Sequence, residues 1–325
     1  AVVGYIIVEY LLFRYYAPRL RTFSEKKDCI TVPDFFAARF DDKDGRLRIL
    51  LVIIFMIFMV TYVAAQFVGG GKAFFAYFGL NQTTGLIITA VIVLIYTLMG
   101  GFLAVSLTDV LQAIVMLIAL IGLPLVAIAG FSESDSISYT LKDARQGFFN
   151  PVAFGFGSMI GLLGIGFGSS GNIHILLHYF SIRDPKQFKM TALVGTIWNI
   201  LLAFGAFMIG LMARAYFPET AMLPGTDPEN AYITLAKELL PGPLVGILLA
   251  SIFAAIMSTA DSQLLVATSS IVRDLYDKIL KKNKYVKPER LTFLSRIMVA
   301  VLVYLAILLG LLIEDIVFWF VLFAW

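Results

Sequence analysis

The stretch "PLVGILLASIFAAIMSTADSQLLVATSSI" (Pro243–Ile271) is long and apolar enough to cross a bilayer, which takes about 20 residues. Near its middle, four polar side chains fall within two turns of one predicted helix: Ser258, Thr259, Asp261 and Ser262. A charged side chain at the centre of a bilayer costs about 2.5–3.5 kcal/mol on insertion scales. The stretch therefore predicts a membrane helix whose polar centre serves a purpose other than crossing the bilayer.

The composition extends this interpretation to the whole chain. The 325 residues are 60% hydrophobic and only 14% charged, whereas a soluble domain has about 25% charged residues. Long uncharged runs recur, so we predict one polytopic transmembrane domain over residues 1–325. Because the chain begins and ends inside apolar runs, at Ala1 and Trp325, we expect a fragment truncated at both ends. The single cysteine, Cys29, excludes an intrachain disulfide.

Hydropathy predicts eight membrane spans and the beginning of a ninth near Ile316. They cover residues 1–17, 48–71, 84–100, 104–130, 151–178, 188–213, 243–273 and 293–313. Three connecting segments hold 20 of the 25 Lys and Arg residues: Arg14–Arg48, Arg183–Lys189 and Arg273–Arg296. These segments lie on one side if the spans alternate, and the positive-inside rule makes that side cytoplasmic. In the loop after the sixth span, on the opposite side, "ENAYITLAKELL" predicts a short helix.

Two carboxylates lie within the apolar cores of the second to eighth spans, Asp109 and Asp261. Each has an alternative structural explanation. Asp109 or the preceding Thr108 can cap the N-terminus of the fourth span. Asp261 lies in the middle of its span, where it can instead form a hydrogen bond that holds two helices together.

The hydroxyl groups of the seventh span add to the argument. Ala255, Ser258, Thr259 and Ser262 follow the spacing i, i+3, i+4, i+7 and share one helix face. Hydroxyl, carbonyl and carboxylate oxygens suit a hard cation such as Na⁺. The alternative is that the hydroxyls bond only to carbonyls of their own helix, which is common in membrane helices. The spacing alone leaves both interpretations open.

The fifth span, "FGFGSMIGLLGIGFGSSGNIHILL", is rich in glycine. Gly164 and Gly168 fit close helix packing, and the glycine density also predicts an interrupted helix of the kind that lines a transporter's substrate site. His174 and His178 are one turn apart. This spacing fits either a pair of metal ligands or two polar residues at a helix end. The chain has no CxxC pair and no phosphate-binding loop.

Three stretches carry a resemblance to a known family: "VPDFFAARFDDK" (Val32–Lys43), "YTLMGGFLAVSLTDVLQAIVM" (Tyr96–Met116) and "LLASIFAAIMSTADSQLLVATSSIVRDLY" (Leu248–Tyr276). They resemble the sodium:solute symporter family, and most of all its sodium/proline branch. The resemblance implies an all-α polytopic membrane protein with the leucine-transporter-like fold, a helix bundle of five-plus-five inverted repeats. The chain would cover core helix 2 to the start of core helix 10.

The resemblance also implies a set of sodium ligands. The main sodium site would take the backbone carbonyl of Ala255 and the hydroxyls of Ser258 and Thr259, with its other half on the absent first core helix. Asp109 would serve sodium release, and Asp109, Ser258, Asp261 and Ser262 would form an inner cation site in the manner of some family members.

The substrate positions depart from the proline branch. Proline transporters carry Trp, Tyr and Pro where this chain has Ile165, Ser169 and Ile173, which argues against proline as the substrate. Tyr62 matches the family, and Gln66 lies one turn further on. Both are expected to line the substrate cavity, with hydrogen bonding between helices as the alternative role.

Together these patterns predict a non-enzymatic, sodium-coupled symporter of the cell membrane. It would import a small organic solute, such as an amino acid or another small organic acid, by alternating access, with Na⁺ as the coupling ion. Its expected partners are the solute and the bilayer, with no nucleic acid and no obligate protein. One alternative is a proton-coupled carrier of the same fold with Asp109 or Asp261 protonated. Another is a channel or a membrane sensor that binds solute without moving it.

Overall fold

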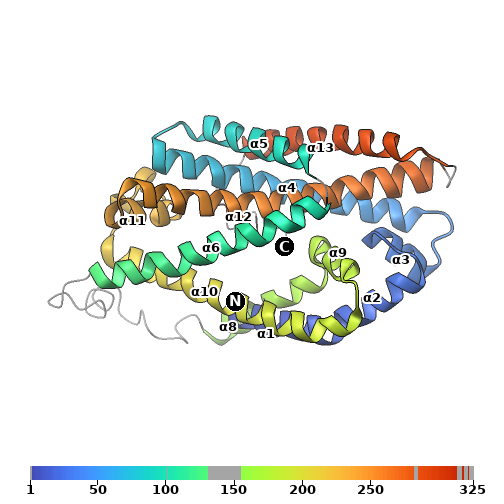
Figure 1. Cartoon of the computed structure of the whole chain (residues 1–325), viewed down its shortest axis with the longest axis horizontal. Helices are drawn as coiled ribbons and strands as arrows, with labels where there is room; N and C mark the ends of the chain where they lie inside the picture. Colours follow the sequence, from blue (N-terminus) through green and yellow to red (C-terminus); the bar gives the residue numbers. More distant parts are fainter. Residues whose placement is uncertain are drawn as a thin grey trace.

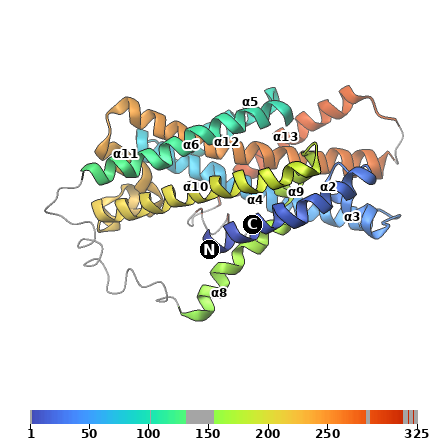
Figure 2. The same cartoon turned by 60° about the horizontal axis from the view of Figure 1, so that its bottom comes forward.

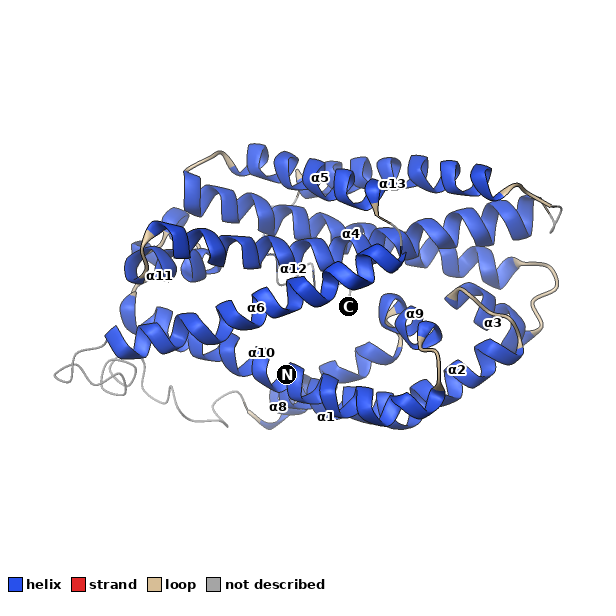
Figure 3. Ribbon diagram, viewed as in Figure 1, coloured by secondary structure: helices blue, strands red, loops and turns tan. Residues whose placement is uncertain are grey.

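The computed structural model describes residues 2–100, 102–130, 155–281, 285–312, 317 and 321. Within these residues the chain is helical and contains no strand, as Figure 3 shows. Hydrocarbon offers no hydrogen-bond partner to the backbone, so a segment that crosses a bilayer must bond to itself as a helix. Most of the helices run along the longest axis of the molecule (Figure 1). The predicted ninth span, from Ile316, lies almost entirely outside the described residues.

Four long helices form one layer, in which they pack side by side in both Figure 1 and Figure 2. They are α4 (Arg46–Phe78), α5 (Gln82–Met99), α12 (Gly242–Ser269) and α13 (Pro288–Gly310). α12 continues inward as a π-helix, η7 (Ser270–Leu280). Buried apolar side chains fill the layer, among them Phe67, Leu264 and Leu302.

The second layer contains the first span, the glycine-rich span and α10 (Phe188–Tyr216). The first span is α1 (Val2–Leu11), the π-helix η1 (Leu12–Tyr16) and α2 (Ala17–Lys26), followed by the separate helix α3 (Val32–Phe40). A 3₁₀ turn, η3 (Pro185–Gln187), precedes α10. Between the layers runs α6 (Phe102–Gly130), which packs on both α12 and α10. The sequence-predicted short helix is confirmed as α11 (Ala231–Leu239), after three 3₁₀ turns at 220–222, 224–226 and 228–230.

Among the described residues, six helices are long and apolar enough to cross a membrane: Arg46–Phe78, Gln82–Met99, Val105–Gly130, Pro185–Tyr216, Gly242–Leu280 and Pro288–Gly310. They correspond to the second, third, fourth, sixth, seventh and eighth predicted spans. Their outward apolar side chains, such as Leu193 and Tyr304, are exposed, as expected for a surface in contact with lipid. The chain is therefore a multi-pass membrane protein.

The fifth predicted span is interrupted. It consists of α8 (Phe156–Gly164), a 3₁₀ segment η2 (Ile165–Ser170), two residues outside any helix, and α9 (Ile173–Ser181). The packing glycine is Gly166, because a Cβ there would lie 2.7 Å from the backbone oxygen of Gly4 on α1. No atom of the part of the chain that the structure describes lies within 4 Å of a Cβ added at Gly164, so the expectation of close packing at Gly164 is wrong. The expectation of an interrupted helix is confirmed.

The three basic connecting segments lie at one end of the molecule, here called the inner end, with α11 at the opposite, outer end (Figure 1). That the inner end faces the cytoplasm stays a prediction from the positive-inside rule.

An ion network joins three segments at the inner end. Arg48 Nη1 lies 2.6 Å from a carboxylate oxygen of Asp34 on α3 and 2.6 Å from one of Asp274 on η7. Thr31, the N-cap of α3, donates its hydroxyl to Asp274 at 3.0 Å, and Arg273 approaches Asp34 at 3.4 Å. Burial opposes ionisation of Asp34, but the hydrogen bond and positive charge of Arg48 hold the pKa of this carboxyl below its usual range. The network fixes α3 to the inner ends of α4 and η7.

Arg48→Gln is expected to lower the free energy of unfolding by about 3–5 kcal/mol, because it leaves the buried carboxylate of Asp274 without its cation and that of Asp34 with the more distant Arg273. The side chains of Arg48, Asp34 and Asp274 are only 13%, 8% and 0% exposed. Chaotrope unfolding of the purified full-length protein measures the change. The matched control is Arg46→Gln, whose ion pair with Asp44 is on the surface and contributes less than about 1 kcal/mol. Equal losses in both variants would contradict the role of the network.

Gly166→Ala is expected to lower stability by about 1–3 kcal/mol, since the new methyl group forces α1 away from η2. Gly164→Ala adds the same methyl group into open space and should be neutral or stabilising by up to about 1 kcal/mol. The two thermal unfolding curves, compared with the wild type, provide the measurement. Indistinguishable effects of the two substitutions would show that the contact between α1 and η2 is not tight.

Candidate functional site

The polar centre of α12 lies where this helix packs on α4 and α6. Ser258 donates its hydroxyl to the carbonyl of Ala255 at 3.2 Å, a bond within its own helix. Ser258, Thr259 and Ser262 are half-buried. The bond of Ser258 uses its proton and leaves the oxygen lone pairs available, so it does not prevent this hydroxyl from acting as a ligand.

Asp261 is fully buried in the next turn of α12, at 0% exposure. One carboxylate oxygen accepts the backbone N–H of Ser262 at 2.5 Å. The other oxygen is buried and has no hydrogen-bond partner among the described residues. An acid in this position retains a strong capacity to bind a cation or a proton.

Asp109 faces this carboxylate from α6. The charges of Asp109 and Asp261 interact, and both act on Tyr96 of α5. The Tyr96 hydroxyl is bonded to Thr108, and one side-chain oxygen of Asp109 is buried without a partner among the described residues. α6 begins at Phe102, so Asp109 lies almost two turns inside the helix and the N-cap explanation for Asp109 is wrong. The structure therefore brings together the two carboxylates that the sequence singled out.

The expected substrate residues lie on α4 and at the interruption of the fifth span. Tyr62 is buried on α4, and its ring meets the edge of His174 on α9, with 6.4 Å between ring centroids. His174, the second residue of α9, thus packs on Tyr62. Gln66 is half-buried one turn further along α4. Ile173, the first residue of α9, is buried beside His174.

The 3₁₀ segment η2 begins at Ile165 and contains Ser169. Ser169 is fully buried, and its hydroxyl has no partner among the described residues. Asn172, just before α9, is 3% exposed, and both of its side-chain polar atoms are also unpartnered in the described part of the chain. The interruption therefore provides buried polar groups able to bind a polar ligand.

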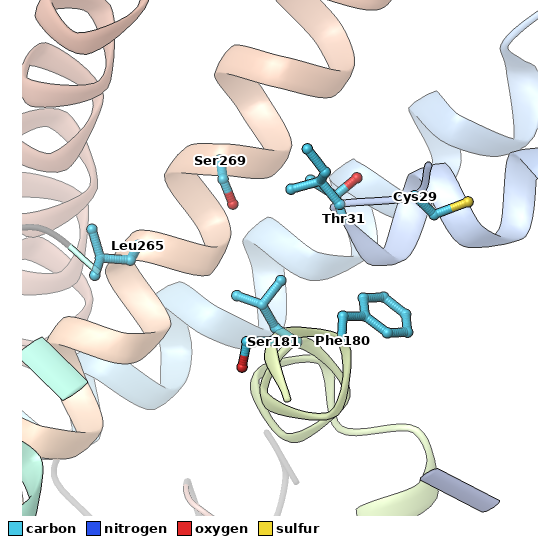
Figure 4. A pocket seen from close by; sticks show the side chains of 8 residues that line it. Cys29, Thr31, Phe180, Ser181, Leu265 and Ser269 are labelled. Atoms are coloured by element: carbon cyan, nitrogen blue, oxygen red, sulfur yellow. The ribbon is translucent and has the colours of Figure 1, made fainter. Parts of the chain in front are cut away.

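A cavity of about 380 Å³ lies further inward, between α9, α12 and the segment before α3. Figure 4 shows Leu265 and Ser269 of α12 on one side of it, Phe180 and Ser181 of α9 on another, and Cys29 with Thr31 on the third. Burial and the nearby Asp34 raise the pKa of the Cys29 thiol, so this cysteine is a poor nucleophile. Ser258, Ser262, Leu265 and Ser269 are spaced i, i+4, i+7, i+11 and share one face of α12.

The first span contains a buried acid that the sequence did not lead us to expect, because charges within the membrane were considered only from the second span onward. Glu9 of α1 is 8% exposed and accepts a hydrogen bond of 2.9 Å from the side-chain amide of Asn199 on α10. Tyr5, one turn away, also bonds to Glu9. The signal was present as an acidic residue within the first apolar run. In the structure Glu9 ties α1 to α10.

The family model for the sodium:solute symporter family matches residues 1–325. The osmoregulated proline transporter OpuE of Bacillus subtilis (strain 168) is 36% identical over 316 residues, which cover 95% of this chain and 62% of OpuE. The high-affinity proline transporter PutP of the same organism is 36% identical over 313 residues, or 95% of this chain and 65% of PutP. A sodium/proline symporter of Staphylococcus aureus is 36% identical over 311 residues, with coverages of 94% and 60%.

A solved structure of a Na⁺-coupled sialic acid symporter, in a substrate-bound outward-open state, matches with a TM-score of 0.78 at 21% identity. The match covers 95% of this chain and 66% of that one. It confirms the expected fold class, a leucine-transporter-like helix bundle. The chain spans 60–65% of the length of the three proline transporters. Because the family model matches this chain from residue 1 to residue 325, the chain belongs to the sodium:solute symporter family.

Proposed function

We propose that the full-length protein is a sodium-coupled symporter that imports a small organic solute by alternating access. The observation that carries this proposal is the pair of interacting carboxylates on two membrane helices, Asp109 of α6 and Asp261 of α12, beside the hydroxyls of α12. Such a pair is costly unless a cation or a proton compensates it. Family membership favours Na⁺. The membrane potential would add about 2.3 kcal/mol per charge per 100 mV to the driving force.

The main sodium site is proposed at Ala255, Ser258 and Thr259. The carbonyl and the two hydroxyls come from adjacent turns of one helix, and such oxygens are ligands for a hard cation. The remaining ligands would come from the part of the relatives that this chain does not span.

A second, inner cation site is proposed at Asp109, Ser258, Asp261 and Ser262. Two bare carboxylates that interact repel each other, and a cation between them removes the repulsion. The inner cavity continues the Ser258 and Ser262 face of α12 through Leu265 and Ser269. An ion released from the inner site would follow this face towards the cytoplasm, and Asp109 would assist its release.

The solute is proposed to bind between α4 and the interruption of the fifth span, beside Tyr62, Gln66, Ile165, Ser169 and Ile173. The buried hydroxyl of Ser169, unpartnered among the described residues, supports a ligand at this position. If Ile165 and Ser169 stand where proline transporters carry Trp and Tyr, the site has more room than one shaped for proline. An amino acid or another small organic acid bulkier than proline would fit this difference.

A proton-coupled carrier is the second candidate, because the free oxygen of Asp261 can hold a proton as well as face a cation. Uptake by the full-length protein in proteoliposomes, driven in turn by a sodium gradient and by a proton gradient, separates the two. The sodium proposal fails if a panel of radiolabelled amino acids and small organic acids shows no sodium-driven accumulation.

Thr259→Ala and Ser258→Ala are each expected to raise the sodium concentration for half-maximal uptake roughly 5- to 150-fold. The reason is that loss of one ligand oxygen in a buried site costs about 1–3 kcal/mol. Thr292→Ala is the control, because this threonine is exposed on α13 and bonds only to its own helix at 3.1 Å. An unchanged sodium dependence in both site variants would refute the main sodium site.

Asp261→Asn tests the inner site, because it keeps the size and hydrogen bonding of the side chain and removes its charge. Cation binding at this site predicts that the variant loses a sigmoidal sodium dependence and moves less charge per solute. Uptake and current, measured together in the same vesicles, give both quantities. Wild-type cooperativity and charge-to-solute ratio in Asp261→Asn would mean that Asp261 binds no coupling ion.

A further inference from the structure

A second inner-end cavity, of about 600 Å³, opens between the first span and the start of α10. Four basic residues line it: Arg14 of η1, Arg19 of α2, Lys186 of η3 and Lys189 of α10. They come from two segments about 170 positions apart in the chain, which the packing of α2 on η3 and of η1 on α10 brings together. No acidic residue of the described ranges lines the cavity. The positive charge is therefore concentrated by the fold.

These four cations have no acidic partner among the described residues. Other basic residues of the inner end do, since Lys43, Arg46 and Arg48 each pair with a nearby aspartate. Asp184, two residues before Lys186, accepts the backbone N–H of Lys186 at 2.9 Å and so caps η3. The N-terminus of α10, with its partial positive charge, also lies at the cavity. This arrangement attracts an anion.

The surface beyond the cavity is apolar. Leu193, Ile197 and Ile200 stand at i+4, i+8 and i+11 from Lys189, on the same face of α10. They are 54%, 50% and 49% exposed, on a helix that spans the membrane. A hydrocarbon chain can lie along this face while its head group enters the basic cavity. The site thus offers complementary surfaces to both ends of an amphiphile.

We propose that this cavity binds the phosphate head group of an anionic phospholipid of the inner leaflet, with its acyl chains along α10. The phosphate would contact Arg19, Lys186 and Lys189, and Arg14 would lie beside it over the ring of Tyr15. Inorganic phosphate shares the head-group chemistry but leaves the apolar face of α10 uncovered. Basic pockets between membrane helices on the cytoplasmic side are a known mode of anionic lipid binding.

The positive-inside rule alone does not account for this arrangement. It explains an excess of Lys and Arg in inner loops, but not their convergence on one cavity next to a lipid-facing stripe. Lys281 and Lys287 belong to the same inner end and are not among the residues that line the 380 Å³ cavity or the 600 Å³ cavity, so they provide the matched comparison.

The test uses the purified full-length protein in a neutral detergent. Short-chain phosphatidylglycerol, short-chain phosphatidylcholine and inorganic phosphate are titrated separately while the thermal unfolding temperature is recorded. The variants are Lys186→Gln/Lys189→Gln and, as control, Lys281→Gln/Lys287→Gln. Arg19→Gln is a milder third variant in case the first double variant folds poorly. The proposal does not depend on sodium coupling, since the measurement involves no transport.

Phosphatidylglycerol is expected to stabilise the wild type and the control saturably, and phosphatidylcholine to have little effect. The Lys186/Lys189 double variant should bind phosphatidylglycerol about 30-fold more weakly, and Arg19→Gln several-fold more weakly. Equal stabilisation by the two lipids, or wild-type affinity in the Lys186/Lys189 variant, overturns the proposal. If inorganic phosphate raises the unfolding temperature as much as phosphatidylglycerol does at equal concentration, the assignment to a lipid is overturned.

Discussion

The absence of water from the bilayer interior is the constraint on which this structure depends. Every backbone N–H and C=O that crosses the hydrocarbon must bond within the chain, so long uninterrupted helices such as α4 and α12 are the rule. The interruption at η2 is tolerated because protein covers it, with α1 packed against it as closely as Gly4 and Gly166 allow. Irregular backbone at membrane depth therefore occurs where another helix shields it and where it can serve a ligand.

The absence of water from the bilayer interior also determines where charged side chains lie along the membrane normal. At the inner end, Arg48 compensates Asp34 and Asp274, and at the outer end Lys72 lies 2.8 Å from Asp227 and 2.5 Å from Glu229. In the described part of the centre, Asp109 and Asp261 have each other and no basic side chain. Charges with a structural role are paired at the two ends, whereas the central pair has no basic partner in the described part of the chain.

Local sequence patterns predicted much of the fold, but they did not predict the contacts of the site. Apolar runs predicted the six long helices, and glycine density predicted the interruption before α9. Periodicity cannot tell which glycine another helix approaches, so Gly164 was chosen where Gly166 makes the contact. Asp109 was open to an N-cap role because the sequence pattern did not reveal that α6 begins as early as Phe102. That Asp109 faces Asp261 came from the family resemblance, since no spacing rule joins residues about 150 positions apart.

The ion network of Arg48 has a consequence for how the inner end can move. It fastens α3 to α4 and η7, while Arg21 of α2 donates to the backbone carbonyl of Ile182 at 2.6 Å and fastens α2 to the end of α9. The short link from Lys27 to Ile30, with Asp28 in the left-handed region at φ 51°, is the direct covalent joint between these two separately anchored helices. Because Cys29 and Ile30 of this link also line the cavity between α9 and α12, a change in the link would change the shape of that cavity.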